Sequence, residues 1–219
     1  MRIVAHLSAD KNLIAAFKEG EDVHRATAAQ VFHTTADKVT SEERRYAKTI
    51  NFGLIYGKSA YGLSKDLGIS QEKARQFIGR YFEKYPGVAR YMEETKKRAH
   101  EKGYVETLFG RRIYLPEIYA DNATIRKGAE RTAINAPVQG TAADLVKEAM
   151  IAVQNFLQQE NLKSRMLMQV HDELILEVPE QEQTIVKNKI KDLMEQVADW
   201  AVPLVVDLGL GPDWQNAHS

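Results

Sequence analysis

The chain has 219 residues, of which 44% are hydrophobic, and its 30 Lys and Arg balance 30 Asp and Glu, with no cysteine. This length can bury the core of one large domain or two small ones. The absence of cysteine excludes disulfides and thiolate metal sites. No apolar run approaches the roughly 18 residues of a membrane span, and the N-terminus lacks the apolar core of a signal peptide. We therefore expect a cytoplasmic globular protein without membrane contact.

Charge is distributed unevenly along the chain. Residues 1–130 carry 23 basic and 17 acidic side chains, whereas residues 131–219 carry 7 basic and 13 acidic ones. A solvated surface with a chance imbalance accounts for this distribution. A basic part that faces phosphates and an acidic part that holds metal accounts for it equally well. Only a uniformly basic nucleic-acid-binding protein is excluded.

Hydrophobic periodicity and turn residues predict an α+β protein whose first 120 residues are mainly helical. The expected elements, in chain order, are a short strand at 2–8, helices at 10–18 and 22–32, a helix from the capping box of Thr40 and Glu43 to Gly57, two helices within 70–103 divided at Pro86, a hairpin at 104–116, helices at 123–134 and 140–160 interrupted by Pro137, two strands within 165–179 joined by a polar turn, a helix from Pro179 to 199, and a last strand at 203–211.

One stretch carries an unusual helical face. In RRYAKTINFGLIYG (44–57) four residues recur at intervals of four and so share one broad stripe of a helix: Arg44, Lys48, Phe52 and Tyr56. An ordinary core stripe would consist of Leu, Ile, Val or Ala. Two cations followed by two aromatic rings instead suit phosphate oxygens and a base or sugar. The stripe therefore indicates a nucleotide site.

A polar turn is the second candidate. In MLMQVHDELILEV (166–178) apolar strands flank His171, Asp172 and Glu173. Adjacent carboxylates at a tight turn can both project to one side, and Mg²⁺ usually takes one or two carboxylates plus substrate phosphates. A plain hairpin whose charged residues solvate the turn explains the same pattern. The segment alone leaves both interpretations open.

The segment ERTAINAPVQGTAAD (130–144) is the third candidate. Arg131, Asn135 and Gln139 again lie four residues apart, although Pro137 interrupts a simple helix. Their side chains are donors suited to a nucleic-acid backbone or to a minor-groove edge. A helix terminus with solvated polar residues is the alternative.

Two further features carry less information. The hairpin tip Gly110-Arg111-Arg112 is either an exposed turn or a phosphate contact. Five histidines show no metal-binding spacing and are interpreted as surface or packing residues: His6, His24, His33, His100 and His218. Taken together, the cations, the aromatic face, the paired carboxylates and the amide donors are the parts that phosphoryl transfer to a nucleic-acid end requires.

These segments resemble family A DNA polymerases, the bacterial DNA polymerase I type. RRYAKTINFGLIYG is similar to motif B, the fingers helix, and QVHDE is similar to motif C of the palm. GYVETLFGRR, AERTAINAPVQGTAAD and DWQNAH also match, so the resemblance runs essentially from end to end. It implies a partial right-hand fold with a residual palm strand at 1–8, a mostly helical fingers subdomain at 9–122, and a palm-type antiparallel sheet with helices at 123–219.

The resemblance also implies roles for the residues of the helical stripe. Arg44 and Lys48 bind the triphosphate of an incoming dNTP, and Lys48 is in addition catalytic. Phe52 stacks against the nucleotide sugar and base. Tyr56 belongs to the nucleotide site and, with the DNA-contacting Gly57, borders the templating base.

Outside the stripe, the resemblance implies metal and DNA contacts. Asp172 is a catalytic carboxylate that ligates Mg²⁺ together with its neighbour Glu173, and His171 lies close to the primer terminus. Three residues contact the primer–template duplex: Arg131, Asn135 and Gln139. The implied partners are therefore primer–template DNA and dNTPs.

The implied function is template-directed DNA synthesis in replication or repair, with transfer of a nucleotide from a dNTP to a primer 3′-OH. The motif A aspartate of the family would lie shortly before Met1, so we expect a fingers-and-partial-palm fragment whose two-metal site is incomplete and which is inactive alone. Exposed palm surface would favour self-association. The alternatives are a non-catalytic dNTP- or DNA-binding module, one piece of a split polymerase, or a structural fragment without activity.

Overall fold

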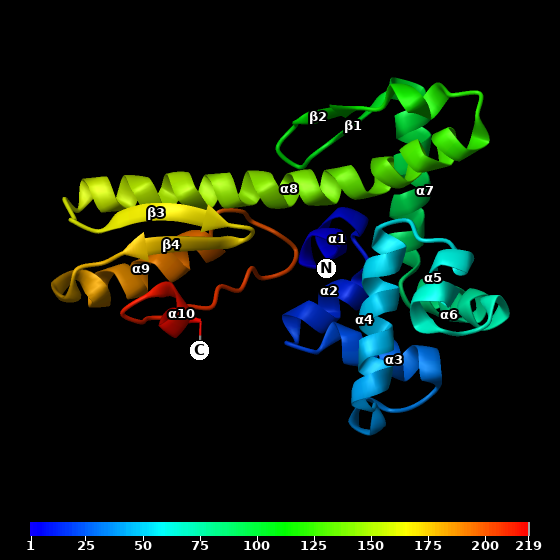
Figure 1. The fold of residues 1–219 in the computed structure, drawn as a ribbon, viewed down its shortest axis with the longest axis horizontal. Coiled ribbons are helices and arrows are strands. Elements are labelled where there is room, and N and C mark those ends of the chain that lie inside the picture. Colours follow the sequence, from blue (N-terminus) through cyan, green and yellow to red (C-terminus); the bar gives the residue numbers. More distant parts are fainter. Residues whose placement is uncertain (219) are drawn as a thin grey trace. The chain divides into compact units, whose positions relative to one another are not determined.

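The computed structural model describes residues 1–218, which form two compact units. The first unit is Met1–Thr141, and the second begins at Ala142. One helix, α8 (Ala123–Gln159), contributes to both units (Figure 1). Small antiparallel sheets accompany many helices, so the predicted α+β class is confirmed. Among the described residues no helix is long and apolar enough to cross a membrane.

The first unit is mainly helical. Its elements before α8 are α1 (Arg2–Ser8), α2 (Lys11–Lys18), α3 (Val23–Phe32), η1 (Ala36–Lys38), α4 (Ser41–Ile55), α5 (Ala60–Leu67), α6 (Gln71–Lys84), α7 (Pro86–Lys102), β1 (Tyr104–Glu106), β2 (Arg112–Tyr114) and η2 (Pro116–Tyr119). At the starts of α2 to α6, first-turn N–H groups donate hydrogen bonds to the side chains of the N-cap residues, which are Asp10, Asp22, Thr40, Ser59 and Ser70. Each such cap satisfies a donor that the helix cannot.

Packing of α4 against α3 and of α5 against α6 organises this unit. Val31 of α3, Ile50 of α4 and Tyr81 of α6 are fully buried. Asp10, the cap of α2, also accepts a hydrogen bond from the backbone N–H of Gly87 at 2.7 Å, which ties α2 to the start of α7. Buried side chains from α3, α4 and α6 therefore contribute to the core of the first unit.

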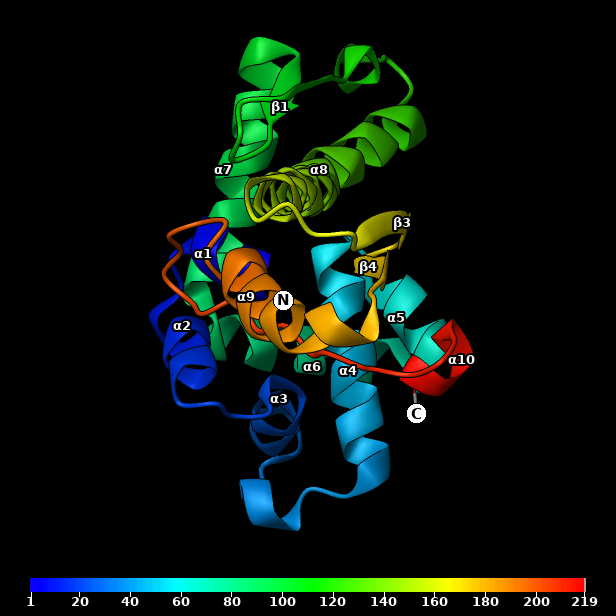
Figure 2. The same ribbon diagram turned by 90° about the vertical axis from the view of Figure 1, so that its left-hand side faces the viewer.

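The β1–β2 hairpin follows α7 and lies beside it in both ribbon views (Figures 1 and 2). Tyr104 pairs with Tyr114, and Glu106 pairs with Arg112, whose Nε lies 3.1 Å from Glu106 Oε1. Opposite charges across a strand pair stabilise its register. The hairpin predicted at 104–116 is confirmed.

Helix α4 begins and ends at the residues that the sequence predicts. The Thr40 hydroxyl accepts a hydrogen bond from the N–H of Glu43, and the Glu43 carboxylate accepts one from the N–H of Thr40, which is the capping box. At the other end Gly57 has a φ of 69°. The N–H of Gly57 donates to the carbonyl of Leu54, and that of Lys58 donates to the carbonyl of Gly53. This pair of bonds is a Schellman motif.

The second unit consists of the C-terminal part of α8, β3 (Arg165–Val170), β4 (Glu173–Glu177), η3 (Glu180–Glu182), α9 (Gln183–Glu195) and α10 (Trp214–Ala217). β3 and β4 form an antiparallel hairpin (Figure 2). In the core of the second unit α8 packs against α9 through five buried residues: Val153, Phe156, Leu157, Val186 and Ile190. The predicted strand, polar turn and strand at 165–179 are confirmed.

Three predicted elements are wrong. Residues 2–8 form helix α1 instead of a residual palm strand, because Val4, Ala5 and Ser8 are buried at helical spacing against α2 and α7. Residues 203–211 form no strand in the described structure, where each sheet has two strands and the N–H of Val206 donates to the Glu195 carboxylate at 2.9 Å. Helix α9 ends at Glu195 and not at 199.

Pro137 does not interrupt the helix. It lies inside α8, where it lacks an N–H and costs about 3 kcal/mol or more. Ala133, Ile134 and Thr141 are buried on either side of it, and burial of a helix face can outweigh one lost hydrogen bond. The subdomain boundaries at 8/9 and 122/123 stay predictions.

Replacement of Gly57 by Ala tests the close packing at the end of α4. A Cβ at position 57 would lie 2.8 Å from Arg131 Cγ, and the left-handed backbone there is unfavourable for any residue with a Cβ. Gly20 is a matched control, because it closes the same motif after α2 at φ 71° with nothing within 4 Å of a Cβ. We expect Gly20→Ala to lower the free energy of unfolding by about 1 kcal/mol and Gly57→Ala by about 2–4 kcal/mol.

Urea unfolding followed by far-UV circular dichroism measures this difference. Both tryptophans, Trp200 and Trp214, lie in the second unit, so their fluorescence would report the wrong part of the chain. Equal destabilisation by the two substitutions would contradict the contact between Gly57 and Arg131.

Candidate functional site

The helical stripe predicted from the sequence lies on α4. Arg44, Lys48 and Phe52 lie on the helix, and Tyr56 is its C-cap. The Arg44 side chain is 42% exposed and Lys48 is exposed. The rings of Phe52 and Tyr56 are stacked, with centroids 6.5 Å apart and an interplanar angle of 20°. The α4 stripe, as we call these four residues, therefore offers two accessible cations beside an aromatic surface.

The N-terminus of α3 adds two residues to the α4 stripe. Asp22 Oδ2 lies 2.5 Å from Arg44 Nε, and the ring centroid of His24 lies 5.6 Å from that of Phe52. The ring contact with Phe52 agrees with the interpretation of His24 as a packing residue, whereas its place beside the stripe was not predicted. Asp22 is recognisable in sequence only as a helix cap, since nothing local indicates that α3 packs on α4.

A buried amide side chain forms a hydrogen bond with His24. Asn51 is fully buried on α4, and its Nδ2 lies 2.9 Å from Nδ1 of His24. Thr27 Oγ1 lies 3.2 Å from Asn51 Oδ1 and 3.2 Å from the hydroxyl of Tyr85. Because an amide nitrogen can only donate, His24 Nδ1 accepts this bond and the neutral ring carries its proton on Nε2. The imidazole N–H thus points away from the buried layer.

The charges at this site shift two pKa values. Burial lowers the pKa of His24, the nearby Arg44 and Lys48 cations lower it further, and only the Asp22 carboxylate opposes them. For Asp22, burial alone would raise the pKa, but the hydrogen bonds from Arg44 and from the N–H groups of Arg25 and His24 hold it below its usual range. The site therefore contains a neutral histidine and an ionised aspartate at neutral pH.

The third candidate segment meets the end of α4. Arg131 lies on α8 with its Cγ against Gly57. Asn135 and Gln139 follow at intervals of four, and since α8 is continuous here, the three residues share one helix face. Arg131 and Gln139 are exposed, while Asn135 Oδ1 is buried without a hydrogen-bond partner among the described residues. The structure thus joins the α4 stripe and this polar face within the first unit.

The polar turn lies at the tip of the β3–β4 hairpin in the second unit. Val170 pairs with Glu173, so His171 and Asp172 form a two-residue turn. His171 has a φ of 53°, a left-handed conformation that histidine adopts more readily than most residues. Its carbonyl accepts a hydrogen bond from the Gln169 side chain. Both turn residues are exposed, which keeps their side chains accessible.

Asp172 and Glu173 are the residues that can hold a hard cation at this turn. Their oxygens are ligands of the kind that Mg²⁺ prefers. Glu173 Oε1 lies 3.1 Å from His218 Nε2, so a metal ion at Glu173 would compete with that contact. Among residues 1–218 no group of three or more His, Asp or Glu residues is placed to hold a metal ion.

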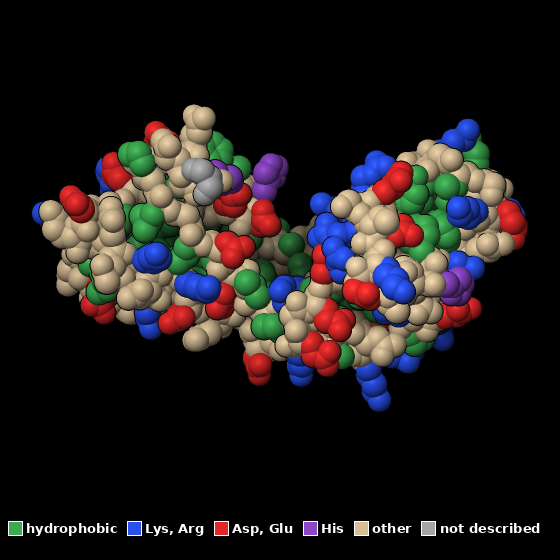
Figure 3. Space-filling model, turned by 90° about the horizontal axis from the view of Figure 1, so that it is seen from below, with side chains coloured by type: hydrophobic (Ala, Val, Ile, Leu, Met, Phe, Trp, Pro, Cys, Tyr) green, Lys and Arg blue, Asp and Glu red, His purple; other side chains and the backbone are tan. Residues whose placement is uncertain are grey.

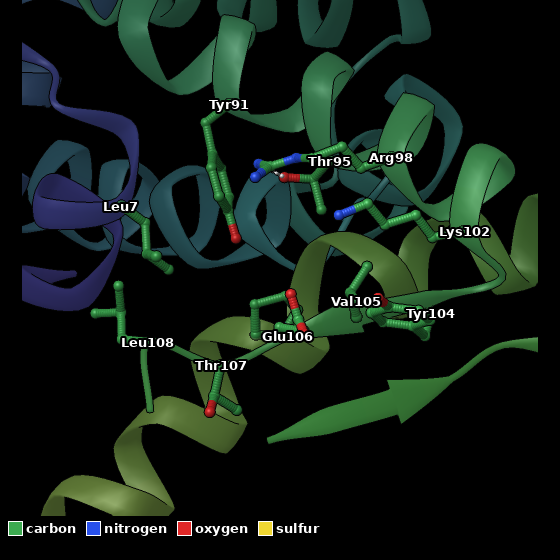
Figure 4. A pocket seen from close by; sticks show the side chains of 11 residues that line it. Leu7, Tyr91, Thr95, Arg98, Lys102, Tyr104, Val105, Glu106, Thr107 and Leu108 are labelled. Atoms are coloured by element: carbon green, nitrogen blue, oxygen red, sulfur yellow. Dashed lines mark hydrogen bonds between the residues drawn. The ribbon is translucent and has the colours of Figure 1, made fainter. Parts of the chain in front are cut away.

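None of the candidate site residues lines the cavity described in the first unit. A cavity of about 280 Å³ lies elsewhere in the first unit, between α1, α7, β1 and α8 (Figure 4). Thr95, Arg98 and Lys102 of α7 line it, and Arg98 Nη2 donates to Thr95 Oγ1 at 3.5 Å. Lys and Arg side chains gather on one part of the molecular surface with acidic side chains around them (Figure 3). The α4 stripe is an open, charged face that suits an extended polyanion.

Comparison with known proteins gives consistent matches along the chain. The model of the family described as DNA polymerase family A matches residues 1–216. DNA polymerase I of Pseudomonas aeruginosa is 55% identical over 218 residues, which are 100% of this chain and 24% of that protein. DNA polymerase I of Bacillus subtilis is 49% identical over 217 residues, 99% of this chain and 25% of that protein. The chain thus spans about a quarter of the length of these relatives.

A solved structure shares the fold. It is described as the POL domain of Pol1 from M. smegmatis in complex with DNA primer-template and dNTP. The match covers 100% of this chain and 38% of the M. smegmatis chain. The TM-score is 0.95 at 44% sequence identity. Such a score means that the two backbones follow the same course throughout.

The lowered pKa of His24 predicts a pH dependence. Its folded pKa lies below the ordinary 6.5, so the unfolded chain binds this proton more readily than the folded chain. We expect the free energy of unfolding to fall as the pH drops from 6.5 toward the folded pKa, and this part of the dependence to disappear in His24→Gln. Titration of the His24 ring protons by NMR, assigned through the same variant, measures the pKa directly. A value of 6.5 or higher would contradict the burial described above.

Proposed function

Because the chain belongs to DNA polymerase family A, we propose that it is part of a DNA-directed DNA polymerase and that its α4 stripe binds the incoming dNTP. The reaction is template-directed transfer of a nucleotide from a dNTP to a primer 3′-OH. The observation that carries the proposal is the order of side chains along α4, with cations at Arg44 and Lys48 followed by stacked rings at Phe52 and Tyr56. A dNTP has the same order of parts, from triphosphate to sugar and base.

The two cations account for triphosphate binding. Arg44 and Lys48 lie one turn apart, and each can form charge-assisted hydrogen bonds worth about 1.5–3 kcal/mol. The planar Arg44 guanidinium suits two oxygens at once, whereas Lys48 acts as a compact point charge. Because Lys48 is exposed, its ammonium can reach the phosphoryl group on which charge develops, and this is the basis of its proposed catalytic role.

The aromatic pair accounts for contact with the sugar and base. Phe52 is half-buried between His24 and Tyr56, so its ring is held in place and presents one face. Tyr56 is 44% exposed. Stacking of a base on an aromatic ring contributes about 1–3 kcal/mol and does not depend on which base is present. This tolerance suits a site that accepts each dNTP in turn.

Primer–template DNA is the proposed second partner. Gly57 lies against Arg131, Asn135 and Gln139 follow on the same face of α8, and His171 presents an exposed imidazole at the hairpin turn. Backbone phosphates account for most of the affinity in such interfaces. The M. smegmatis protein of the same fold is described in complex with primer-template and dNTP, which supports this assignment.

Mg²⁺ is the proposed cofactor, and Asp172 and Glu173 would hold it. When bound, the ion neutralises charge on phosphate oxygens and lowers the pKa of an attacking hydroxyl. Asp172 is exposed at the turn and is available as a ligand without further change. Glu173 first has to release His218, whose Nε2 lies 3.1 Å from Glu173 Oε1.

Two further proposals concern the chain by itself. Leu167 and Met168 of β3 are 57% and 48% exposed, and such apolar surface favours self-association. A cytoplasmic location follows only from the composition and stays a prediction.

The alternative function, a dNTP- or DNA-binding module without catalysis, differs from the polymerase in primer extension and not in binding.

Lys48→Ala tests the triphosphate contact. We expect the dissociation constant of the 219-residue chain for a dNTP to rise at least about tenfold, the loss of one charge-assisted contact. Lys97→Ala is the matched control, since it removes an exposed lysine from α7, where Lys97 pairs with Glu101 outside the α4 stripe. Isothermal titration calorimetry measures both. Equal effects of the two substitutions would remove Lys48 from the site.

Primer extension tests catalysis by residues 1–219. Of the two palm carboxylates on which the two-metal mechanism depends, this stretch supplies Asp172. We therefore expect no extension by the purified 219-residue chain with either Mg²⁺ or Mn²⁺, although dNTP binding persists. Asp172→Ala, purified in parallel, controls for contaminating polymerases. Extension by the unchanged chain that is lost in Asp172→Ala would support the proposed role of Asp172 and contradict the expected need for a second palm carboxylate.

A further inference from the structure

Asp22 is bound on two sides at the start of α3. Its Oδ1 accepts hydrogen bonds from the N–H groups of His24 and Arg25 at 3.0 and 3.1 Å and so caps the helix. Its Oδ2 lies 2.5 Å from Arg44 Nε. A helix cap needs only one oxygen, so the second contact serves another purpose.

That second contact occupies a residue of the proposed nucleotide site. Arg44 is one of the two cations of the α4 stripe, and its contact with Asp22 runs through Nε while 42% of the side chain stays exposed. Asp22 is itself 35% exposed, so a ligand on the α4 stripe can reach the ion pair. A phosphate group and the Asp22 carboxylate then compete for one guanidinium.

We propose that Asp22 is a positioning residue that holds Arg44 in the absence of nucleotide and exchanges it for phosphate when a triphosphate binds. This inference rests on the proposed function of the α4 stripe. The carboxylate makes every phosphate ligand of Arg44 replace an existing ion pair, so weak anions are disfavoured.

The proposal predicts tighter binding when the charge of Asp22 is removed. Asn caps a helix as well as Asp does, so Asp22→Asn keeps α3 and removes only the competing anion. Partly exposed ion pairs contribute little, and we expect the dissociation constant for a dNTP to fall about three- to fivefold. Inorganic triphosphate without a nucleoside should show the same change, because the exchange involves phosphate alone.

A double-mutant cycle separates exchange from a through-space effect of charge. In the Arg44→Ala background, Asp22→Asn should leave dNTP affinity unchanged, because there is no ion pair to replace. Asp66→Asn is the matched control: Asp66 is also 35% exposed and also pairs with a cation, but with Lys58. We expect no change in dNTP affinity from Asp66→Asn. Asp22→Ser, a second capping residue, repeats the test in case the amide creates a new contact.

Three outcomes would overturn the proposal. Weaker or unchanged dNTP binding in both Asp22→Asn and Asp22→Ser would mean that Asp22 does not compete for Arg44. Tighter binding that persists in Arg44→Ala would mean that the carboxylate acts only through its field. An equal gain in Asp66→Asn would mean that any lost acid has the same effect. If Lys48→Ala loses dNTP binding while the Asp22 and Arg44 variants behave as expected, this inference is unaffected. If the unsubstituted chain shows no measurable dNTP binding, the proposed function itself is contradicted.

Discussion

The buried amide of Asn51 is the interaction on which the α4 stripe depends. It lies on the inner face of α4, where it bonds His24 on one side and Thr27 on the other, and Thr27 in turn meets the hydroxyl of Tyr85. An unpaired amide in this position would cost about 1–3 kcal/mol, so the layer tolerates few arrangements of α3 against α4. The register of the two helices then determines that Asp22 and His24 lie beside Arg44 and Phe52.

This arrangement explains how an exposed face can be precise. Side chains on a surface helix usually sample several rotamers, and ordering them lowers the affinity for a ligand. Here Arg44 is held by Asp22, and Phe52 is enclosed by the rings of His24 and Tyr56. Lys48 alone has no such support among the described contacts. The α4 stripe is thus largely preorganised, although it is not enclosed in a cavity.

The sequence predicts those features that depend on neighbouring residues. Thr40 and Glu43 lie three residues apart, Gly57 follows the last turn of α4, and the turn at His171 divides two apolar strands, so local rules suffice for all three. The roles of Asp22 and His24 could not be predicted, because they arise from the packing of two helices. Residues 2–8 fit a strand and a helix equally well, and only burial against α2 and α7 decides between them. The helix interruption predicted at Pro137 was wrong for the same reason, since tertiary burial on both sides of Pro137 outweighs its local penalty.

The contact between Gly57 and Arg131 has a consequence for the genetics of the chain. The atoms that a side chain at position 57 would meet are the Cγ, Cβ and Cα of Arg131, of which Cβ and Cα are fixed by the backbone of α8. Every single-nucleotide change of a glycine codon that alters the amino acid and keeps the reading frame open introduces a Cβ. A single change at this codon therefore introduces the contact with Arg131 and the strain of the left-handed backbone in one step.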